Sequence, residues 1–279
     1  MQKRLYSGLG LLLAGLLLLV GCAPTAQDEL TVTLCKVGKA DAIVVQSGGE
    51  TLLIDTGETE DGAKVAALLQ SRGVTAVKAM IVTHFDKDHV GGAADILAQF
   101  AVGTVYTPDY VGTRPEYADF VQAAEAARVP VQRLTEPVTF TLGTAQVLVE
   151  PPETCETPPG EEPDDNNFSL ITTITHGENR LAFLGDAEKK RIRQWLAGDS
   201  ATPCDFLKVP HHGRYNGALE ELFQTLSPEV AVICSSNKHP AEARTLELLA
   251  EVCPQILQTK DGTVTVTSDG SRLQVQQAK

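Results

Sequence analysis

Between a strand-like run and a helix-like run, the chain carries the stretch Thr83-His84-Phe85-Asp86-Lys87-Asp88-His89-Val90-Gly91-Gly92. The apolar residues 79–82 before it are typical of a buried strand, so the stretch predicts a loop between a strand and a helix. Two imidazoles and two carboxylates fall within this loop, and both groups are ligands that suit zinc and its divalent neighbours. The pattern predicts a metal site for one or two ions and disfavours a simple polar surface loop.

Further polar side chains follow three other apolar runs. Asp186 ends the run before residue 187, where an acid is either a metal ligand or the N-cap of a helix. His211 and His212 directly follow residues 205–209, and such adjacent histidines before a glycine favour a functional role. His239 follows residues 230–234. Since loops at strand ends commonly carry function, we expect these loops to meet at one shared site.

Strand and helix patterns alternate along the chain in two similar halves. Strands are predicted at residues 30–36, 41–46, 51–55, 77–83, 104–107, 145–150, 168–175, 180–184, 205–209, 230–234, 255–258, 263–267 and 272–275. Helices are predicted at residues 61–71, 92–100, 114–128, 187–196, 218–226 and 241–252. Each half is rich in strands first and then alternates strands with helices, which indicates an α/β protein with two sheets face to face and helices outside.

Three local features complete this interpretation. Residues 150–165 hold five prolines and many acids, so we expect an exposed loop, either a lid or an insertion without a role. His176 is expected at a solvated hairpin tip. Of the six cysteines, none forms a C-x-x-C pair, and those near strands are expected in the core. Cys155 and Cys253 could pair.

The N-terminus has the pattern of a signal peptide. Lys3 and Arg4 precede the apolar residues 9–20, a run shorter than the roughly 20 residues that a membrane span needs. The small residues before Cys22 resemble the lipobox of bacterial lipoproteins, which implies cleavage after residue 21 and lipidation of Cys22. Residues 22–29 would then be a tether, and the protein would be anchored outside the cytoplasmic membrane. The alternative is an ordinary signal peptide with an incidental cysteine.

The composition limits the partners. The chain has 23 basic and 36 acidic side chains and a formal net charge of −13. A broad nucleic-acid surface needs Lys and Arg against phosphates, so long nucleic acid is not favoured, although a local basic groove stays open.

These motifs together resemble the metallo-β-lactamase superfamily, and most closely its branch of ComEC-like competence proteins. The His-x-Asp-x-Asp-His pattern of residues 84–89 carries the resemblance, which extends over residues 30–270. Further matching segments are residues 37–42, 53–57, 166–170, 184–186, 207–213, 239–240 and 259–262.

The resemblance implies a four-layer αββα sandwich over residues 30–279 that binds one or two metal ions. His84 and Asp86 would hold one ion, and Asp88 and His89 the other. Asp186 would bridge them, and either His211 or His212 would complete the second. Asn167, or Asp165 nearby, lies where relatives place a further histidine.

The function expected from the site is metal-assisted hydrolysis with Zn²⁺, or alternatively Mn²⁺, on a phosphodiester substrate. Asp88 would orient or deprotonate the attacking water, and His212 would act beside it as a second catalytic group. The expected substrate-binding residues are Asn167, Lys39, Arg214, Asn216 and His239. Two alternatives remain: a hydrolase of another ester, thioester or lactam, and a metal-binding lipoprotein without catalysis.

Overall fold

A computed structural model describes residues 29–278 of the chain. The predicted signal peptide, Cys22 and all of the predicted tether except residue 29 lie outside these residues. Within residues 29–278, no helix combines the length and the apolar character that a membrane span requires.

The strands of the described residues form two sheets. The first has eight strands in the order β15-β14-β1-β2-β3-β4-β5-β6, and the second has seven in the order β13-β12-β11-β10-β9-β8-β7. The bounds in the first sheet are β1 Leu30–Leu34, β2 Ala42–Ser47, β3 Glu50–Thr56, β4 Ala76–Ile81, β5 Ala101–Pro108, β6 Val131–Leu134, β14 Val264–Ser268 and β15 Leu273–Gln277. Those in the second are β7 Val138–Leu142, β8 Ala145–Glu150, β9 Ile171–His176, β10 Asn179–Phe183, β11 Phe206–Lys208, β12 Val230–Ile233 and β13 Gln255–Gln258.

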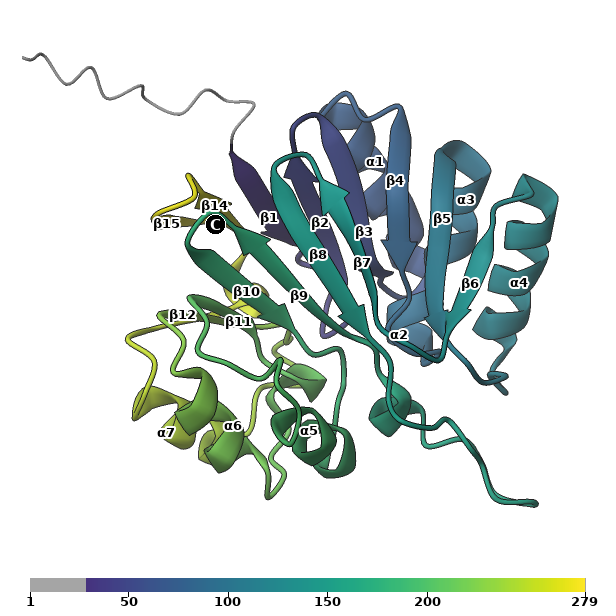
Figure 1. Cartoon of the computed structure of the whole chain (residues 1–279). Coiled ribbons are helices and arrows are strands. Elements are labelled where there is room, and N and C mark those ends of the chain that lie inside the picture. The colour runs from purple at the N-terminus through teal and green to yellow at the C-terminus, as the bar shows by residue number, and fades with distance from the viewer. Residues whose placement is uncertain (1–28, 279) are drawn as a thin grey trace, which may run out of the picture.

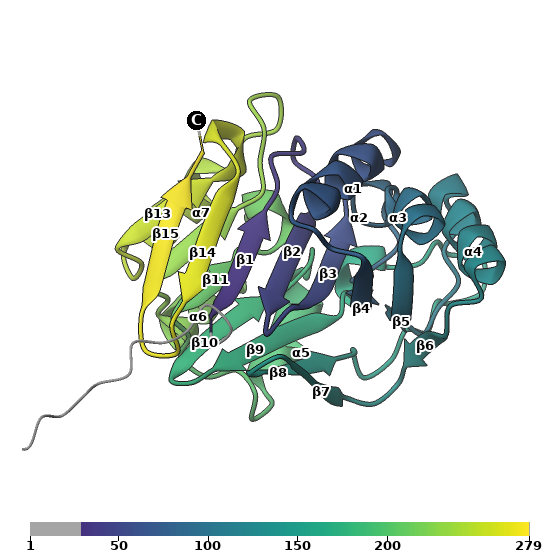
Figure 2. The same cartoon turned by 90° about the horizontal axis from the view of Figure 1, so that it is seen from above.

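Helices cover the outer face of each sheet (Figure 1). The first sheet carries α1 Gly62–Ser71, α2 Lys87–Val90, α3 Ala93–Gln99 and α4 Pro115–Ala127, and the second carries α5 Lys189–Leu196, α6 Leu219–Leu226 and α7 Ala243–Ala250. Short 3₁₀ turns are η1 Thr59–Asp61, η2 Asp165–Phe168, η3 His211–Gly213 and η4 Thr259–Asp261. The predicted four-layer αββα sandwich is confirmed, and seen from above the first sheet runs in order from β15 to β6 across the view (Figure 2).

The alternation of side chains in the strands produces three apolar layers. In β2, Ile43 and Val45 point to the layer between the sheets, while Val44 points to the layer under the helices. Phe183 of β10 and Phe206 of β11 meet them from the second sheet, with ring centroids 5.4 Å apart. Successive side chains of a strand face opposite sides, so a strand buried on both faces needs apolar residues throughout.

The strands change from antiparallel to parallel in the same way in both sheets. Strand β3 pairs parallel with β4, β4 with β5 and β5 with β6, and in the second sheet β10 pairs parallel with β11, β11 with β12 and β12 with β13. Parallel neighbours end at the same edge of a sheet, so the loops that follow β4, β10 and β11 lie at corresponding edges.

Two strands, β6 and β7, were not predicted from the sequence. Each lies at the edge of its sheet, and Val131, Gln132 and Arg133 of β6 are exposed. Edge strands face solvent over much of their surface and therefore lack a continuous apolar run. The exposed loop predicted around residues 150–165 is confirmed, since no helix or strand lies between β8 and η2 and the segment projects from the sandwich (Figure 1).

One side-chain expectation was wrong, and one pairing that the sequence left open is not formed. His176 is buried, because the β9–β10 turn packs against the turn at Gly270, and its ring contacts the hydroxyls of Ser268 at 2.8 Å and Thr144 at 3.1 Å. Cys155 and Cys253 are both free and pack against different apolar layers, so they do not pair. The cysteines expected in the core, Cys35, Cys204 and Cys234, are buried there.

Replacing Phe183 by alanine tests the layer between the sheets. Because Phe183 is 1% exposed, we expect the free energy of unfolding to fall by about 3–5 kcal/mol, measured by urea denaturation. Val111→Ala is the control, since Val111 is 62% exposed and its replacement should change the same quantity by less than about 0.5 kcal/mol. Equal effects of the two substitutions would contradict a core between the sheets.

Candidate metal centre

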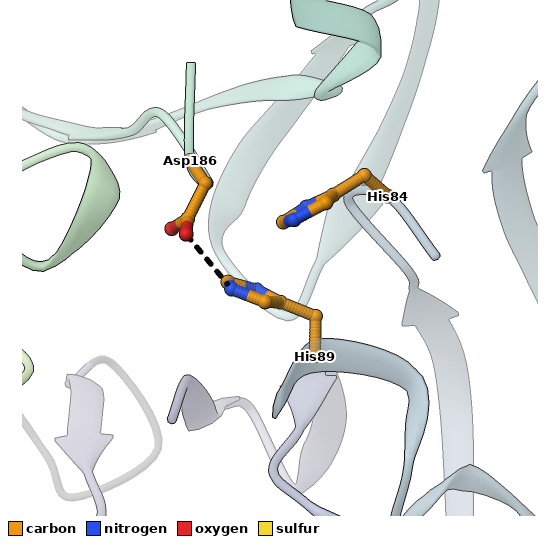
Figure 3. A group of neighbouring side chains, drawn as sticks. All are labelled: His84, His89 and Asp186. Carbon is orange, nitrogen blue, oxygen red and sulfur yellow. Dashed lines mark ion pairs between the residues drawn. The ribbon is translucent and has the colours of Figure 1, made fainter. Parts of the chain in front are cut away.

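The candidate centre lies where the two sheets meet. The loop after β4 and the helix α2 supply His84, Asp88 and His89 from the first sheet. The turns after β10 and β11 supply Asp186 and His212 from the second sheet. Figure 3 shows His84, His89 and Asp186 pointing toward one another from these separate segments. The convergence of loops expected from the sequence is therefore present.

Asp55, at the end of β3, orients both histidines of the first sheet. Its Oδ2 lies 2.8 Å from Nδ1 of His89 and accepts a hydrogen bond from the Thr83 hydroxyl at 2.7 Å. That hydroxyl in turn lies 3.0 Å from Nδ1 of His84. A hydroxyl that donates to Asp55 can only accept from His84, so His84 carries its proton on Nδ1 and presents Nε2 as a bare lone pair, while His89 donates its Nδ1–H to Asp55.

Imidazoles from both sheets lie around one carboxylate oxygen of the second sheet. Oδ2 of Asp186 lies 3.0 Å from Nε2 of His212, 3.3 Å from Nε2 of His89 and 3.9 Å from Nε2 of His211. Nε2 of His212 is also 3.2 Å from Oδ2 of Asp88. Asp186 therefore stands between histidines from both sheets, which is the position expected of a bridging ligand.

The electrostatics of the centre favour a cation. Burial and the neighbouring His89 lower the pKa of His84 to about 4, so His84 is neutral. Burial also opposes charge on His89, but Asp186 and Asp55 outweigh it and raise its pKa well above the ordinary value. Burial alone would raise the pKa of Asp186, yet His212 and His89 hold it well below its usual range. Metal ions compete with protons for such groups.

The donor set fits a divalent ion. Among the described residues, one atom each of His84, His89 and Asp186 lies within 4.8 Å of the others, and so does one atom each of Asp88, His89 and His212. Nε2 of His84, His89 and His212 and Oδ1 of Asp186 are buried there without a hydrogen-bond partner. Buried polar atoms are nearly always paired, so this group of unpaired atoms fits a bound cation.

A buried ion pair lies beneath the centre. Lys208 of β11 contacts Asp41, donates to the Gly185 carbonyl at 2.9 Å and lies 3.6 Å from Oδ1 of Asp186. Burial opposes its charge, but Asp41 and Asp186 raise the pKa of Lys208 above its ordinary value, so it stays protonated. Asp41 belongs to the first sheet, between β1 and β2, and Lys208 to the second.

Several predicted residues adjoin the centre. Oδ2 of Asp86 is 3.8 Å from Nε2 of His84, although its Oδ1 accepts from Arg114 at 2.6 Å. His211 lies 3.0 Å from Glu188 through Nδ1. Lys39 contacts Asp88 directly.

Three predicted substrate residues, Lys39, His239 and Asn167, lie in two different places. Lys39 and His239 line one cavity of about 290 Å³ together with Lys64 and Lys238. The amide of Asn167 is instead engaged at both ends, because it accepts from the backbone N–H of Arg191 in α5 and donates to Asp164.

Asn216 and Arg214 lie in the turn after the histidine pair. Asn216 accepts from the backbone N–H of Ala218 at 3.0 Å, before α6. Arg214 is exposed and directly follows η3.

Three residues of the site were not predicted: Asp55, Asp41 and Lys208. Asp55 could have been found, since it ends an apolar run two residues before Gly57, a signal similar to the one that singled out Asp186. Asp41 and Lys208 have no such local signal, because their role depends on a contact between the two sheets.

Comparison with known proteins agrees with the fold and the centre. The chain belongs to the metallo-β-lactamase superfamily, whose profile matches residues 35–236. Members of this fold are typically metallohydrolases that bind divalent ions, most often Zn²⁺.

Two curated relatives are similar over most of this chain. It is 26% identical over 263 residues to ComE operon protein 3 of Bacillus subtilis, which covers 86% of the chain and 33% of that protein. It is 28% identical over 252 residues to Recombination protein 2 of Haemophilus influenzae, with 87% and 29% covered. The chain thus spans about a third of the length of these relatives. Zn²⁺-bound PqqB from Methylobacterium extorquens shares the fold, with a TM-score of 0.53, 14% identity and coverage of 82% and 98%.

Asp55→Asn tests the orienting role of Asp55. We expect the affinity for Zn²⁺ to fall about 10- to 100-fold, because the neutral amide no longer holds His89 and Thr83 in place. The measurement is a competition titration with a chromophoric chelator. Asparagine tolerates the left-handed φ of 57° at this position, so the backbone is not disturbed. Asp269→Asn, in an exposed turn, is the control, and an Asp55 variant that binds as tightly as this control would contradict the assignment.

Proposed function

We propose that this protein is a metal-dependent hydrolase of phosphodiester bonds that uses Zn²⁺, as one or two ions, with Mn²⁺ as the second candidate metal. The observation that carries the proposal is the group of buried, unpartnered imidazole nitrogens around Asp186. The ligands would be His84, Asp86, Asp88, His89, Asp186 and His211, with His212 beside them. A bound divalent ion would polarise a phosphoryl oxygen and lower the pKa of water from about 15.7 to about 7.

Asp88 is the residue best placed to handle the proton of the attacking water. Its carboxylate faces the centre, 3.2 Å from His212, and it is nearly buried. Burial alone would raise the pKa of Asp88, but the neighbouring imidazoles of His212 and His89 hold it far below its usual range. Asp88 is therefore an anion that can orient a water molecule, and His212 is a donor that can steady the leaving oxygen.

Cations beside the centre support an anionic substrate. Lys39 contacts Asp88 and lines the cavity that also holds Lys64, Lys238 and His239. Lys64 pairs with Asp61 at 2.7 Å and Lys39 with Asp88, so Lys238 is the one lysine of this lining without an ion-pair partner among the described residues. Fixed cations of this kind stabilise the negative charge that develops during phosphoryl transfer. The net charge of −13 favours a small phosphodiester over long nucleic acid.

The names of the relatives are consistent with this substrate class. Recombination protein 2 is named for recombination, which acts on nucleic acid, a phosphodiester polymer. Nucleic acid therefore belongs in any substrate panel, as a short single strand as well as a duplex.

Asp88→Ala tests the reaction. We expect the rate of hydrolysis of a generic phosphodiester with Zn²⁺ or Mn²⁺ to fall at least about 100-fold, the lower limit for loss of general acid–base catalysis. The panel comprises bis(p-nitrophenyl) phosphate, DNA, a phosphomonoester, a carboxylic ester, a thioester and a lactam.

Asp269→Asn is the matched control and should keep the wild-type rate. Equal rates for Asp88→Ala and the wild type would refute the proposed role of Asp88. Turnover confined to the carboxylic ester, thioester or lactam would replace the phosphodiester with that substrate class.

The location of the protein is a second part of the proposal. We infer that the chain is anchored outside the cytoplasmic membrane through a lipid on Cys22, because the segment before it has a lipobox-like pattern. In cell fractionation of a bacterial host, the wild type should sediment with membranes, and Cys22→Ser should move into the soluble extracytoplasmic fraction or stay unprocessed. An unchanged distribution and unchanged mass would contradict lipidation.

A further inference from the structure

The carboxylate of Asp86 is paired with an arginine, whereas the carboxylate of Asp186 lies among histidines. Nε of Arg114 donates to Oδ1 of Asp86 at 2.6 Å. The other oxygen of Asp86 lies 3.8 Å from Nε2 of His84, a fully buried atom without a hydrogen-bond partner. His84 and Asp86 thus face one another as an incomplete pair of ligands, and a guanidinium already neutralises the carboxylate.

A further carboxylate near Asp86, that of Asp165, is partly engaged elsewhere. The hydroxyl of Tyr110 contacts Oδ1 of Asp165 and accepts from the backbone N–H of Phe85 at 2.9 Å. Asp165 therefore lies beside the loop of His84 and Asp86, but one of its two oxygens is held by the phenol. A second ion on this side would have only two side chains of its own, His84 and Asp86, besides a shared oxygen of Asp186.

Arg114 is suited to stay where it is. It is the residue before α4, and Pro115 follows it with a fixed φ, so the backbone that carries the guanidinium is anchored by the helix. Within residues 29–278, Asp86 is its one ion-pair partner. A guanidinium keeps its charge at all ordinary pH values, and half of this side chain remains exposed toward solvent.

We propose that Arg114 takes the place of a second cation at Asp86, so that the centre binds one divalent ion tightly and presents a guanidinium beside it to an anionic substrate. The inference rests on the proposed metal centre and deepens it. The tight ion is held by the side of the site around Asp88, His89 and Asp186. The guanidinium repels a second ion and occupies the carboxylate oxygen that this ion would need.

Titration of the metal-free full chain with Mn²⁺, followed by electron paramagnetic resonance, tests the proposal without any substrate. We expect the wild type to bind one ion tightly and a second at least about tenfold more weakly. Arg114→Ala should tighten the second site at least about tenfold, which corresponds to about 1.4 kcal/mol. Two ions that share Asp186 should then give an exchange-coupled spectrum.

Two further variants make the test specific. Arg114→Ala/Asp86→Asn should lose the second ion again, because the freed carboxylate has been removed. Arg133→Ala is the matched control: Arg133 is similarly exposed and also pairs with an aspartate, Asp109 at 3.8 Å, so its loss should leave the wild-type pattern.

Two equally tight ions in the wild type, or an unchanged second site in Arg114→Ala, would overturn the inference while leaving the hydrolase proposal intact. A wild type that binds no ion at all would refute the metal centre and both proposals.

Discussion

The buried ion pair between Lys208 and Asp41 is the contact on which the centre depends. Each member comes from a different sheet, and both side chains are about 1% exposed. Taking two charges out of water costs several kcal/mol per ion, and only good geometry with further hydrogen bonds offsets this cost. Lys208 has that support from the Gly185 carbonyl and from Asp186. The pair therefore fixes the distance between the sheets at the point where the ligands meet.

The same pair connects the ligands electrostatically. Oxygens of Asp41 lie 3.7 Å from Nδ1 of His212 and 3.8 Å from Nδ1 of His89, one histidine from each sheet. A negative charge behind an imidazole raises the basicity of the nitrogen on the far side, which is the nitrogen that would bind the ion. The two donor groups that include Asp186 or His212 each combine side chains from both sheets. An ion would bind only the closed sandwich, and it would stabilise the folded state by mass action.

Features that depend on residues close together in the sequence could be predicted, whereas features that depend on contacts between distant segments could not. His84, Asp88, His89 and Asp186 could be predicted because they follow strong apolar runs within a few residues, and the alternating pattern placed those runs in two sheets. The edge strands β6 and β7, by contrast, lack such runs because one side faces solvent.

Other features depend on contacts between distant segments. His176 looked like a solvated turn residue, and only the packing of the β9–β10 turn on the turn at Gly270 buries it. The position of Asn167 was predicted as a substrate contact, but α5 engages the amide from 24 residues away. Lys208 in an apolar strand carries no local sign that Asp41, across the sandwich, will neutralise it.

Backbone strain explains how two adjacent histidines reach one carboxylate. In extended backbone, neighbouring side chains point to opposite sides, so His211 and His212 could not both approach Asp186. Here both have left-handed φ values, 45° and 53°, and both Nε2 atoms lie within 3.9 Å of Oδ2 of Asp186. Such conformations cost of order 1–3 kcal/mol each for residues other than glycine.

The residue that follows shows why the strain persists. Gly213 also has a positive φ of 77°, and a Cβ there would lie 2.8 Å from the Cβ of Ala241. The turn therefore packs closely against the segment before α7, and a side chain at Gly213 would push the turn away from that segment. In the first sheet, Asp55 also has a left-handed φ, of 57°, and it holds His89. Strained residues therefore support the ligands from both sheets, which is expected where the surrounding fold keeps side chains in place for a bound ion.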